Sequence, residues 1–197
     1  MYLMGERELI KAAQNGDFDA FSRLINEHKD KIYRLTLKLS GNHHDAEDIM
    51  QETFLKAVDN IDKFKMESSF GTWLYSIALN EFRAKAKSKK RMNLKPIDEY
   101  LPGGHSETSS ELFDWGDPHE IIEKKQIREL IENALAEMPY IYSAPFILRY
   151  MEDMPVKDIS RILKLTVPAT KSRILRARLA LRDVLTEAFR EKRGETL

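Results

Sequence analysis

Apolar residues recur along much of this chain at steps of three, four and seven, the spacing that gathers side chains on one face of an α-helix. The first such segment follows Asp17, a residue type suited to capping a helix N-terminus. Six apolar residues of this helix are predicted to form one stripe for packing in a helical bundle: Phe18, Phe21, Ile25, Ile32, Leu35 and Leu39. His28 falls on the stripe, which favours a half-buried bundle histidine over a ligand.

Two more helices are expected before residue 92. The second runs from about His43 to Asn60, and a loop around Asp62–Glu67 follows it. Ser68 or Ser69 can then cap a third helix, which extends through a basic run to about residue 91. Four apolar residues share one face of this third helix: Phe70, Trp73, Leu74 and Ile77.

The helical pattern fails between residues 93 and 118, where proline, glycine and serine punctuate a polar segment. This segment is too long for an ordinary connection inside one compact domain, so we predict a flexible interdomain linker. Three of its residues are unusual in a free linker and are candidates for docking on a partner: Leu112, Phe113 and Trp115.

Helical periodicity resumes at Glu120 and continues to Pro139, which ends that helix. Pro145 lacks the N–H that would bond to the carbonyl of Ile141, so a helix from Tyr140 is expected to be interrupted or to start near Pro145. Two further helices are predicted, one over residues 155–165 and one after it. The fold class is therefore all-α, with two small helical domains at residues 1–92 and 119–197 joined by the linker.

The amino-acid composition limits the partners, sites and compartments that the chain can have. Lys and Arg total 32 and Asp and Glu total 32, so the formal net charge of zero predicts no polyanion partner by itself. Cysteine is absent, which excludes a disulfide framework and a zinc–thiolate site and fits a reducing cytoplasm. No apolar run approaches the roughly 18 residues of a membrane span, and the N-terminus lacks a signal-like apolar core. We therefore expect a cytoplasmic protein without membrane insertion.

An acidic cluster opens the second helix. Asp45, Asp48 and Glu52 fall in one narrow sector of that helix, with Gln51 beside them. The cluster is open to three interpretations. It is a solvated helix start whose acids complement the helix dipole, a face that contacts a protein partner, or a metal site using His43 or His44. A metal site also needs converging ligands from elsewhere, and the sequence offers no obvious second set.

The third helix carries a polar stripe and then a run of cations. Four residues form the stripe, opposite the apolar face: Ser76, Asn80, Arg83 and Lys87. No acid interrupts the cations from Arg83 to Arg91, so this run is a candidate for phosphate contacts. Trp73 can stack on a base, although its place on the apolar stripe favours the core.

The segment Lys171–Arg178 holds four cations and no acid in eight positions. It follows the predicted helix over residues 155–165, and a tight turn between two such helices presents the second one to the DNA major groove. Arg173 and Arg176 share a face suited to reading base edges, because arginine is the commonest bidentate reader of guanine. Lys171 and Arg178 line another side that is suited to phosphates.

Together these motifs resemble an extracytoplasmic function (ECF, group 4) sigma factor of the sigma-70 family of bacterial RNA polymerase. Residues 45–54 resemble region 2.2, residues 70–80 with the basic run resemble regions 2.3 and 2.4, and residues 138–178 resemble region 4. The resemblance covers most of the chain outside the linker. It departs from the common pattern in Lys164, where a turn glycine is frequent, in Pro168 at the opening of the last helix, and in Ser143, where arginine is common.

The resemblance implies three sets of contacts. The region 2.2 helix docks on the clamp helices of core RNA polymerase through four residues: Asp45, Asp48, Gln51 and Glu52. Region 2 binds the −10 element and captures a base extruded from the opening duplex through seven residues: Lys63, Phe64, Lys65, Ser76, Asn80, Arg83 and Lys87. Region 4 contacts the polymerase flap and reads the −35 element through five residues: Lys171, Ser172, Arg173, Arg176 and Arg178. Phe64 is alternatively a buried anchor beneath its loop.

A sigma factor of this kind is not an enzyme and uses no cofactor or metal. It is monomeric when free, and an anti-sigma factor commonly holds it inactive. Two rival functions use only parts of the pattern. A stand-alone helix-turn-helix repressor would be a dimer with half-sites about 34 Å apart and no use for the acidic cluster. A metal-dependent enzyme would use His43, His44 and the nearby acids.

Overall fold

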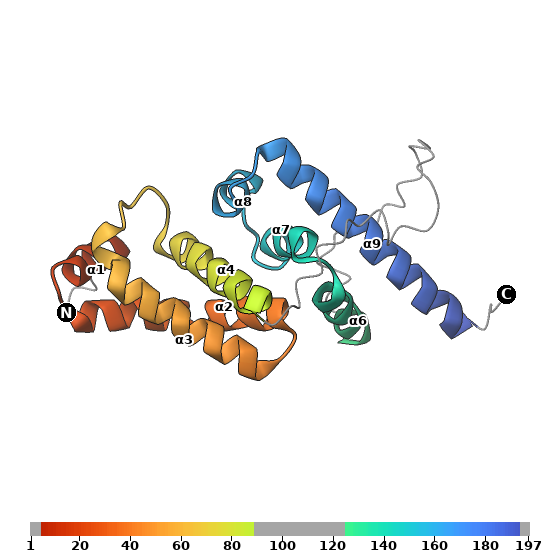
Figure 1. The fold of residues 1–197 in the computed structure, drawn as a ribbon, viewed down its shortest axis with the longest axis horizontal. Coiled ribbons are helices and arrows are strands. Elements are labelled where there is room, and N and C mark those ends of the chain that lie inside the picture. The colour runs from red at the N-terminus through yellow and green to blue at the C-terminus, as the bar shows by residue number, and fades with distance from the viewer. Residues whose placement is uncertain (1–4, 89–124, 194–197) are drawn as a thin grey trace. The chain divides into compact units, whose positions relative to one another are not determined.

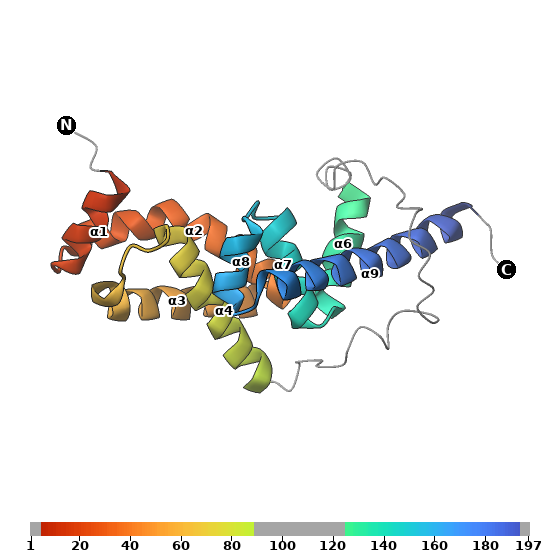
Figure 2. The same cartoon turned by 90° about the horizontal axis from the view of Figure 1, so that it is seen from above.

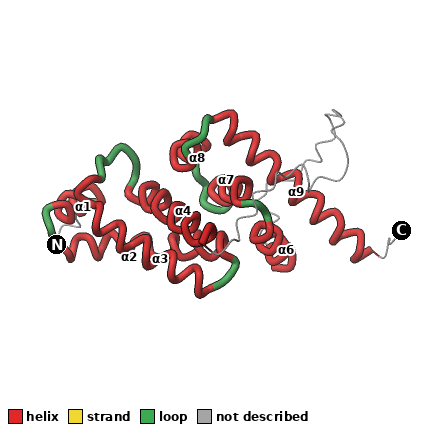
Figure 3. Tube along the Cα trace, viewed as in Figure 1, coloured by secondary structure: helices red, strands yellow, loops and turns green. Residues whose placement is uncertain are grey.

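The computed structural model describes residues 5–88 and 125–193, and these residues form helices and connecting turns without any strand (Figures 1 and 3). The prediction of an all-α fold is confirmed. The chain divides into two compact units, Met1–Arg91 and Met92–Leu197. The predicted linker at 93–118, with Leu112, Phe113 and Trp115, lies outside the described residues. No helix in the described part of the chain is long and apolar enough to cross a membrane.

The first unit is a small bundle of four α-helices and one 3-10 turn within the described residues. Its elements are α1 (Glu6–Gln14), α2 (Phe18–Ser40), α3 (His43–Asn60), η1 (Ile61–Lys63) and α4 (Phe70–Ser88). The turn between α2 and α3 is tight because Gly41 is left-handed, with φ 71°. It brings α2 and α3 side by side, and α4 packs against both of them (Figure 2).

Helix α1 was not predicted, because nine residues offer too short a window for a periodic pattern to stand out. Its apolar residues Leu9, Ile10 and Ala13 are nevertheless buried against the bundle. At its N-terminus, Glu8 accepts a hydrogen bond from the backbone N–H of Gly5, which satisfies one of the free donors of the first turn.

The apolar stripe predicted for α2 is correct in its middle and wrong at its start. Ile32 and Leu35 are fully buried, whereas Phe18 is 71% exposed. The buried face advances in steps of three and four through Phe21 and Leu24, and a strict seven-residue step drifts away from it. His28 is half-buried, as expected, with its ring centroid 5.5 Å from that of Phe70.

The second unit contains α6 (Lys125–Glu137), α7 (Tyr140–Tyr150), α8 (Val156–Leu163) and α9 (Val167–Arg193). The prediction that Pro145 interrupts α7 is wrong, because the helix runs through it without a break. One ladder hydrogen bond is lost, but residues 142–148 are all buried, and this apolar packing outweighs a single missing bond.

Helices α8 and α9 form the predicted helix-turn-helix. Lys164 ends α8 in the left-handed conformation, with φ 54°, and the N–H of Leu165 bonds to the carbonyl of Ser160 at 2.8 Å. This closure satisfies the last carbonyls of α8. Thr166 then caps α9, since its hydroxyl accepts a hydrogen bond from the N–H of Ala169.

Candidate functional site

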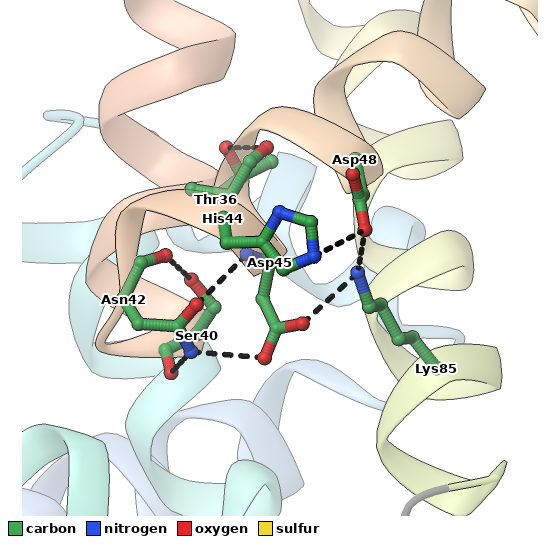
Figure 4. Close-up of polar contacts among 8 residues, drawn as sticks. Thr36, Ser40, Asn42, His44, Asp45, Asp48 and Lys85 are labelled. Atoms are coloured by element: carbon green, nitrogen blue, oxygen red, sulfur yellow. Dashed lines mark hydrogen bonds and ion pairs between the residues drawn. The ribbon is translucent and has the colours of Figure 1, made fainter.

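The start of α3 holds a charged cluster that joins it to α4 (Figure 4). Asn42 caps α3 by accepting from the N–H of Asp45 at 2.8 Å, and its amide donates to the carboxylate of Asp45 at 2.9 Å. The Nζ of Lys85 lies 3.0 Å from Asp45 Oδ1 and 2.6 Å from Asp48 Oδ2. The side chain of His44 lies 3.8 Å from the same oxygen of Asp48.

These contacts shift the pKa values of both charged partners. The hydrogen bond from Lys85 lowers the pKa of Asp48 below its ordinary value. Partial burial acts to lower the pKa of Lys85, but the two carboxylates raise it by more, so its net shift is upward. Both groups therefore stay charged at neutral pH. The sequence analysis placed Lys85 in a run of cations that are candidates for phosphate contacts. In the structure, Lys85 is instead paired with Asp45 and Asp48 of α3.

The structure separates the four acidic-cluster residues into two kinds. The Asp45 side chain is 8% exposed and is held inside the unit, while Asp48 is half-exposed at the edge. Gln51 and Glu52 are exposed. Two exposed apolar residues, Leu55 and Val58, lie one and two turns further along the same side of α3. Sequence reasoning missed both of them, although their spacing from Gln51 and Glu52 was a usable signal.

A cavity of about 350 Å³ opens between the end of α3 and the middle of α4. Eight residues line it: Lys56, Asn60, Lys63, Trp73, Ser76, Ile77, Asn80 and Glu81. Lys63, Ser76 and Asn80 were predicted for one site, and the structure brings these three together. The ion pair between Lys56 and Glu81, 2.7 Å long, was not predicted and forms part of the wall.

Other members of that predicted set take different places. Phe64 is buried and stacks on Trp73, with centroids 4.9 Å apart, which supports its role as an anchor beneath the loop. Trp73 itself is partly exposed at the cavity, not enclosed in the core. Lys65 is exposed and Arg83 half-exposed, both outside the cavity lining, and the side chain of Lys87 lies outside the described residues.

The cations of α9 lie outside its buried apolar face. Ile174, Leu181 and Leu185 are buried, and Lys171 and Ser172 are exposed. Half-exposed positions are occupied by three arginines: Arg173, Arg176 and Arg178. A guanidinium nitrogen of Arg176 lies 3.4 Å from the hydroxyl of Tyr142, so a residue of α7 helps to orient this arginine.

The metal interpretation gains no support from the part of the chain that the structure describes, where no three histidine, aspartate or glutamate residues are grouped to hold an ion. His43 instead makes a hydrogen bond of 2.7 Å with the hydroxyl of Tyr33.

Two family models and several known proteins match this chain. Residues 24–92 match the model of sigma-70 region 2, and residues 128–181 match that of sigma-70 region 4. The chain is 33% identical to the ECF RNA polymerase sigma factor SigW of Bacillus subtilis (strain 168), over 92% of this chain and 97% of that one. It is 28% identical to the RNA polymerase sigma-H factor of Pseudomonas aeruginosa, over 94% and 96% of the two chains.

Solved structures agree on the fold. One of CnrH in complex with the cytosolic domain of CnrY matches with a TM-score of 0.66 at 20% identity, covering 92% of this chain and 97% of that one. One of the sigma factor RpoE in complex with the anti-sigma factor NepR, from Bartonella quintana, matches with a TM-score of 0.61 at 23% identity, covering 84% and 96%.

The two sigma-70 regions define a transcription initiation factor of RNA polymerase. The chain belongs to the ECF family of sigma factors, which confirms the resemblance drawn from its motifs.

Proposed function

We propose that this protein binds core RNA polymerase in the cytoplasm and directs it to a specific set of promoters, with no catalysis of its own. The observation that carries the proposal is the cavity in region 2, whose wall combines an amide, cations and an aromatic ring. Its volume lies at the lower end of the range of small-ligand pockets, so it suits one nucleobase better than a larger ligand.

Core binding is assigned to the exposed side of α3. Gln51 and Glu52 supply polar contacts at its rim, and Leu55, 57% exposed, supplies apolar area at its centre. Asp48 adds a negative charge, and the ion pair with Lys85 holds its carboxylate in place. Asp45 acts here through the fold, because it is held inside the unit by Asn42 and Lys85.

The −10 element is assigned to the cavity and the surface around it. Extrusion of a base from the duplex costs a few kcal/mol, which stacking and phosphate contacts must offset. Trp73 offers a partly exposed ring, Asn80 an amide that reads a base edge, and Lys63 a cation for the backbone. Lys65 and Arg83 extend the positive surface beside it.

The −35 element is assigned to α9 of the helix-turn-helix. Arg173 and Arg176 are placed for base edges in the major groove, and Lys171 and Ser172 lie exposed at the N-terminal end of the helix, near the DNA backbone. Arg178 is a further phosphate contact. The flap of the polymerase is the second partner of this unit.

An anti-sigma factor is the expected regulator, and the free protein is expected to be a monomer. The support comes from the structures of CnrH with CnrY and of RpoE with NepR, which have the same fold as this chain.

Run-off transcription tests the main proposal. The purified protein added to core polymerase should initiate transcription at a subset of genomic promoters, and no stimulation on any promoter would refute it.

The core-binding face is tested with the double variant Gln51→Ala, Glu52→Ala. Its affinity for core should fall by about tenfold, the size of one polar contact pair. The matched control is Asn26→Ala, Glu27→Ala, which removes an adjacent amide and acid from the exposed face of α2.

A further inference from the structure

Helix α1 is tied to both ends of the loop that joins α3 to α4. At the start of this loop, the side-chain amide of Gln14 donates to the carbonyl of Ile61 at 3.0 Å and to that of Phe64 at 2.8 Å. One amide group thus satisfies two carbonyls of the loop, and both of its N–H donors are used.

At the end of the loop, the carboxylate of Glu6 accepts a hydrogen bond of 3.2 Å from the N–H of Phe70, the first residue of α4. This N–H has no partner within its own helix, and a carboxylate at a helix N-terminus is favoured by the helix dipole. Glu6 and Gln14 lie at opposite ends of α1, so one rigid helix spans the loop.

The loop between these two anchors is held in a conformation that it would not adopt freely. Met66 has a φ of 54°, in the left-handed region that disfavours a long side chain. Such a residue persists only where its surroundings over-determine the backbone. At the first anchor, the Phe64 ring is buried between Trp73 and Phe70, with centroid distances of 4.9 and 6.0 Å.

A chain of direct contacts connects α1 with the cavity. Gln14 holds the backbone of Phe64, the Phe64 ring stacks on Trp73, and Trp73 lines the cavity. Lys63, in the same loop segment, lines the cavity as well and bonds to Asn60 at 3.1 Å. A shift of the loop would therefore move Lys63 directly and would change the contact that the Phe64 ring makes with Trp73.

We propose that Gln14 and Glu6 are positioning residues for promoter recognition, in that α1 sets the shape of the loop that forms one wall of the base-binding cavity. The inference rests on the proposed role of that cavity in capturing a base of the −10 element. Neither residue touches DNA in this scheme. Their effect is on how well the cavity distinguishes one base from another.

The test uses holoenzyme assembled from core polymerase and the full chain. A promoter library carries each of the four bases at every −10 position, and sequencing of the transcripts gives the preference at the captured base. Gln14→Met keeps the side-chain length but removes both donors, and the preference should fall by roughly fivefold to tenfold, the size expected for losing a hydrogen-bonded anchor. Glu6→Leu, at the other end of α1, should act in the same direction. Lys11→Met, on the exposed face of the same helix, is the matched control.

Two further readouts separate positioning from general support. Affinity for core and preference at the −35 element should stay within twofold of the wild type for Gln14→Met. If they fall as far as the −10 preference does, α1 is a general structural support and the proposal is wrong.

Asn80→Ala distinguishes the proposed role of α1 from the proposed role of the cavity, on which it rests. If Asn80→Ala flattens the −10 preference while Gln14→Met and Glu6→Leu behave like Lys11→Met, the cavity reads the base but α1 does not position it. If Asn80→Ala and both α1 variants leave the preference unchanged, the cavity itself is misassigned and both proposals are overturned.

Discussion

The ammonium of Lys85 lies 3.0 Å from the carboxylate of Asp45, although the two residues are forty positions apart and belong to different helices. The contact joins the N-terminus of α3 to the C-terminal part of α4. The first of these helices carries the proposed polymerase face and the second carries Asn80. Lys85 therefore couples the geometry of the two surfaces within one small bundle.

Removal of Lys85 should destabilise the first unit. In Lys85→Met the buried carboxylate of Asp45 keeps Asn42 as a partner but loses its cation. Breaking a fully buried pair costs about 3–5 kcal/mol, and the partial exposure of Lys85 reduces this, so we expect a loss of about 2 kcal/mol. Urea unfolding measures it. Lys29→Met, an exposed lysine of α2, should lose less than about 0.5 kcal/mol.

The same cluster predicts a dependence of stability on pH. Because Lys85 lowers the pKa of Asp48 in the folded state, the unfolded chain binds the proton first as the pH falls. The stabilisation is therefore complete above the ordinary pKa of 3.8 and is lost as the pH falls through the lower, folded value. Unfolding free energies of wild type and Lys85→Met, measured from pH 7 to pH 3, should begin to converge below pH 3.8. Parallel curves would contradict the assignment. Burial lowers the pKa of His28, but this contribution is the same in both proteins and cancels in the comparison.

The parts of the structure that were predicted correctly depend on neighbours in sequence. Asp17 caps α2 by accepting from the N–H of Ala20, and the helix-turn-helix of α8 and α9 follows from apolar periodicity on either side of a short turn. The role of Lys85 was missed, because a run of cations looks the same whether its members face solvent or an acid forty residues away. The tie between Gln14 and the carbonyl of Phe64 spans fifty residues, and no local pattern indicates such a contact.

Gly71 leaves room for the ring of His28. A Cβ at this position would lie 3.0 Å from Cε1 and 3.1 Å from Nδ1 of that ring, closer than side-chain packing normally allows. Gly71→Ala should therefore destabilise the first unit, although alanine is the better helix former. In a His28→Ala background the same change should become stabilising by roughly 0.5 kcal/mol, because only the helix propensity remains. Thermal unfolding of the wild type, the two single variants and the double variant gives the effect of Gly71→Ala on stability in each background. The same sign in both backgrounds would contradict the steric explanation.

Lys164 is a site where stability can be gained. Its φ of 54° is unfavourable for a residue with a Cβ and neutral for glycine. Lys164→Gly should raise the unfolding free energy of the second unit by about 1 kcal/mol. Lys164→Ala, which removes the charge but keeps the Cβ, should bring no such gain and separates the backbone effect from electrostatics. Denaturant unfolding of the full chain, followed by a probe in the second unit, measures both.

Alanine substitutions of Arg173 and Lys171 should affect DNA binding in different ways if α9 reads the −35 element. Arg173→Ala removes a base-edge contact, which costs about 1–3 kcal/mol and relaxes the preference at one or two base pairs. Lys171→Ala removes a phosphate contact, so binding should weaken nearly uniformly across sequences, and the slope of log affinity against log salt should become shallower by about 1. Holoenzyme binding to −35 variants at several salt concentrations distinguishes the two. If Arg173→Ala instead changed only the salt slope, its side chain would face phosphates, and the rotation of α9 in the groove would have to place Arg176 or Arg178 on the bases.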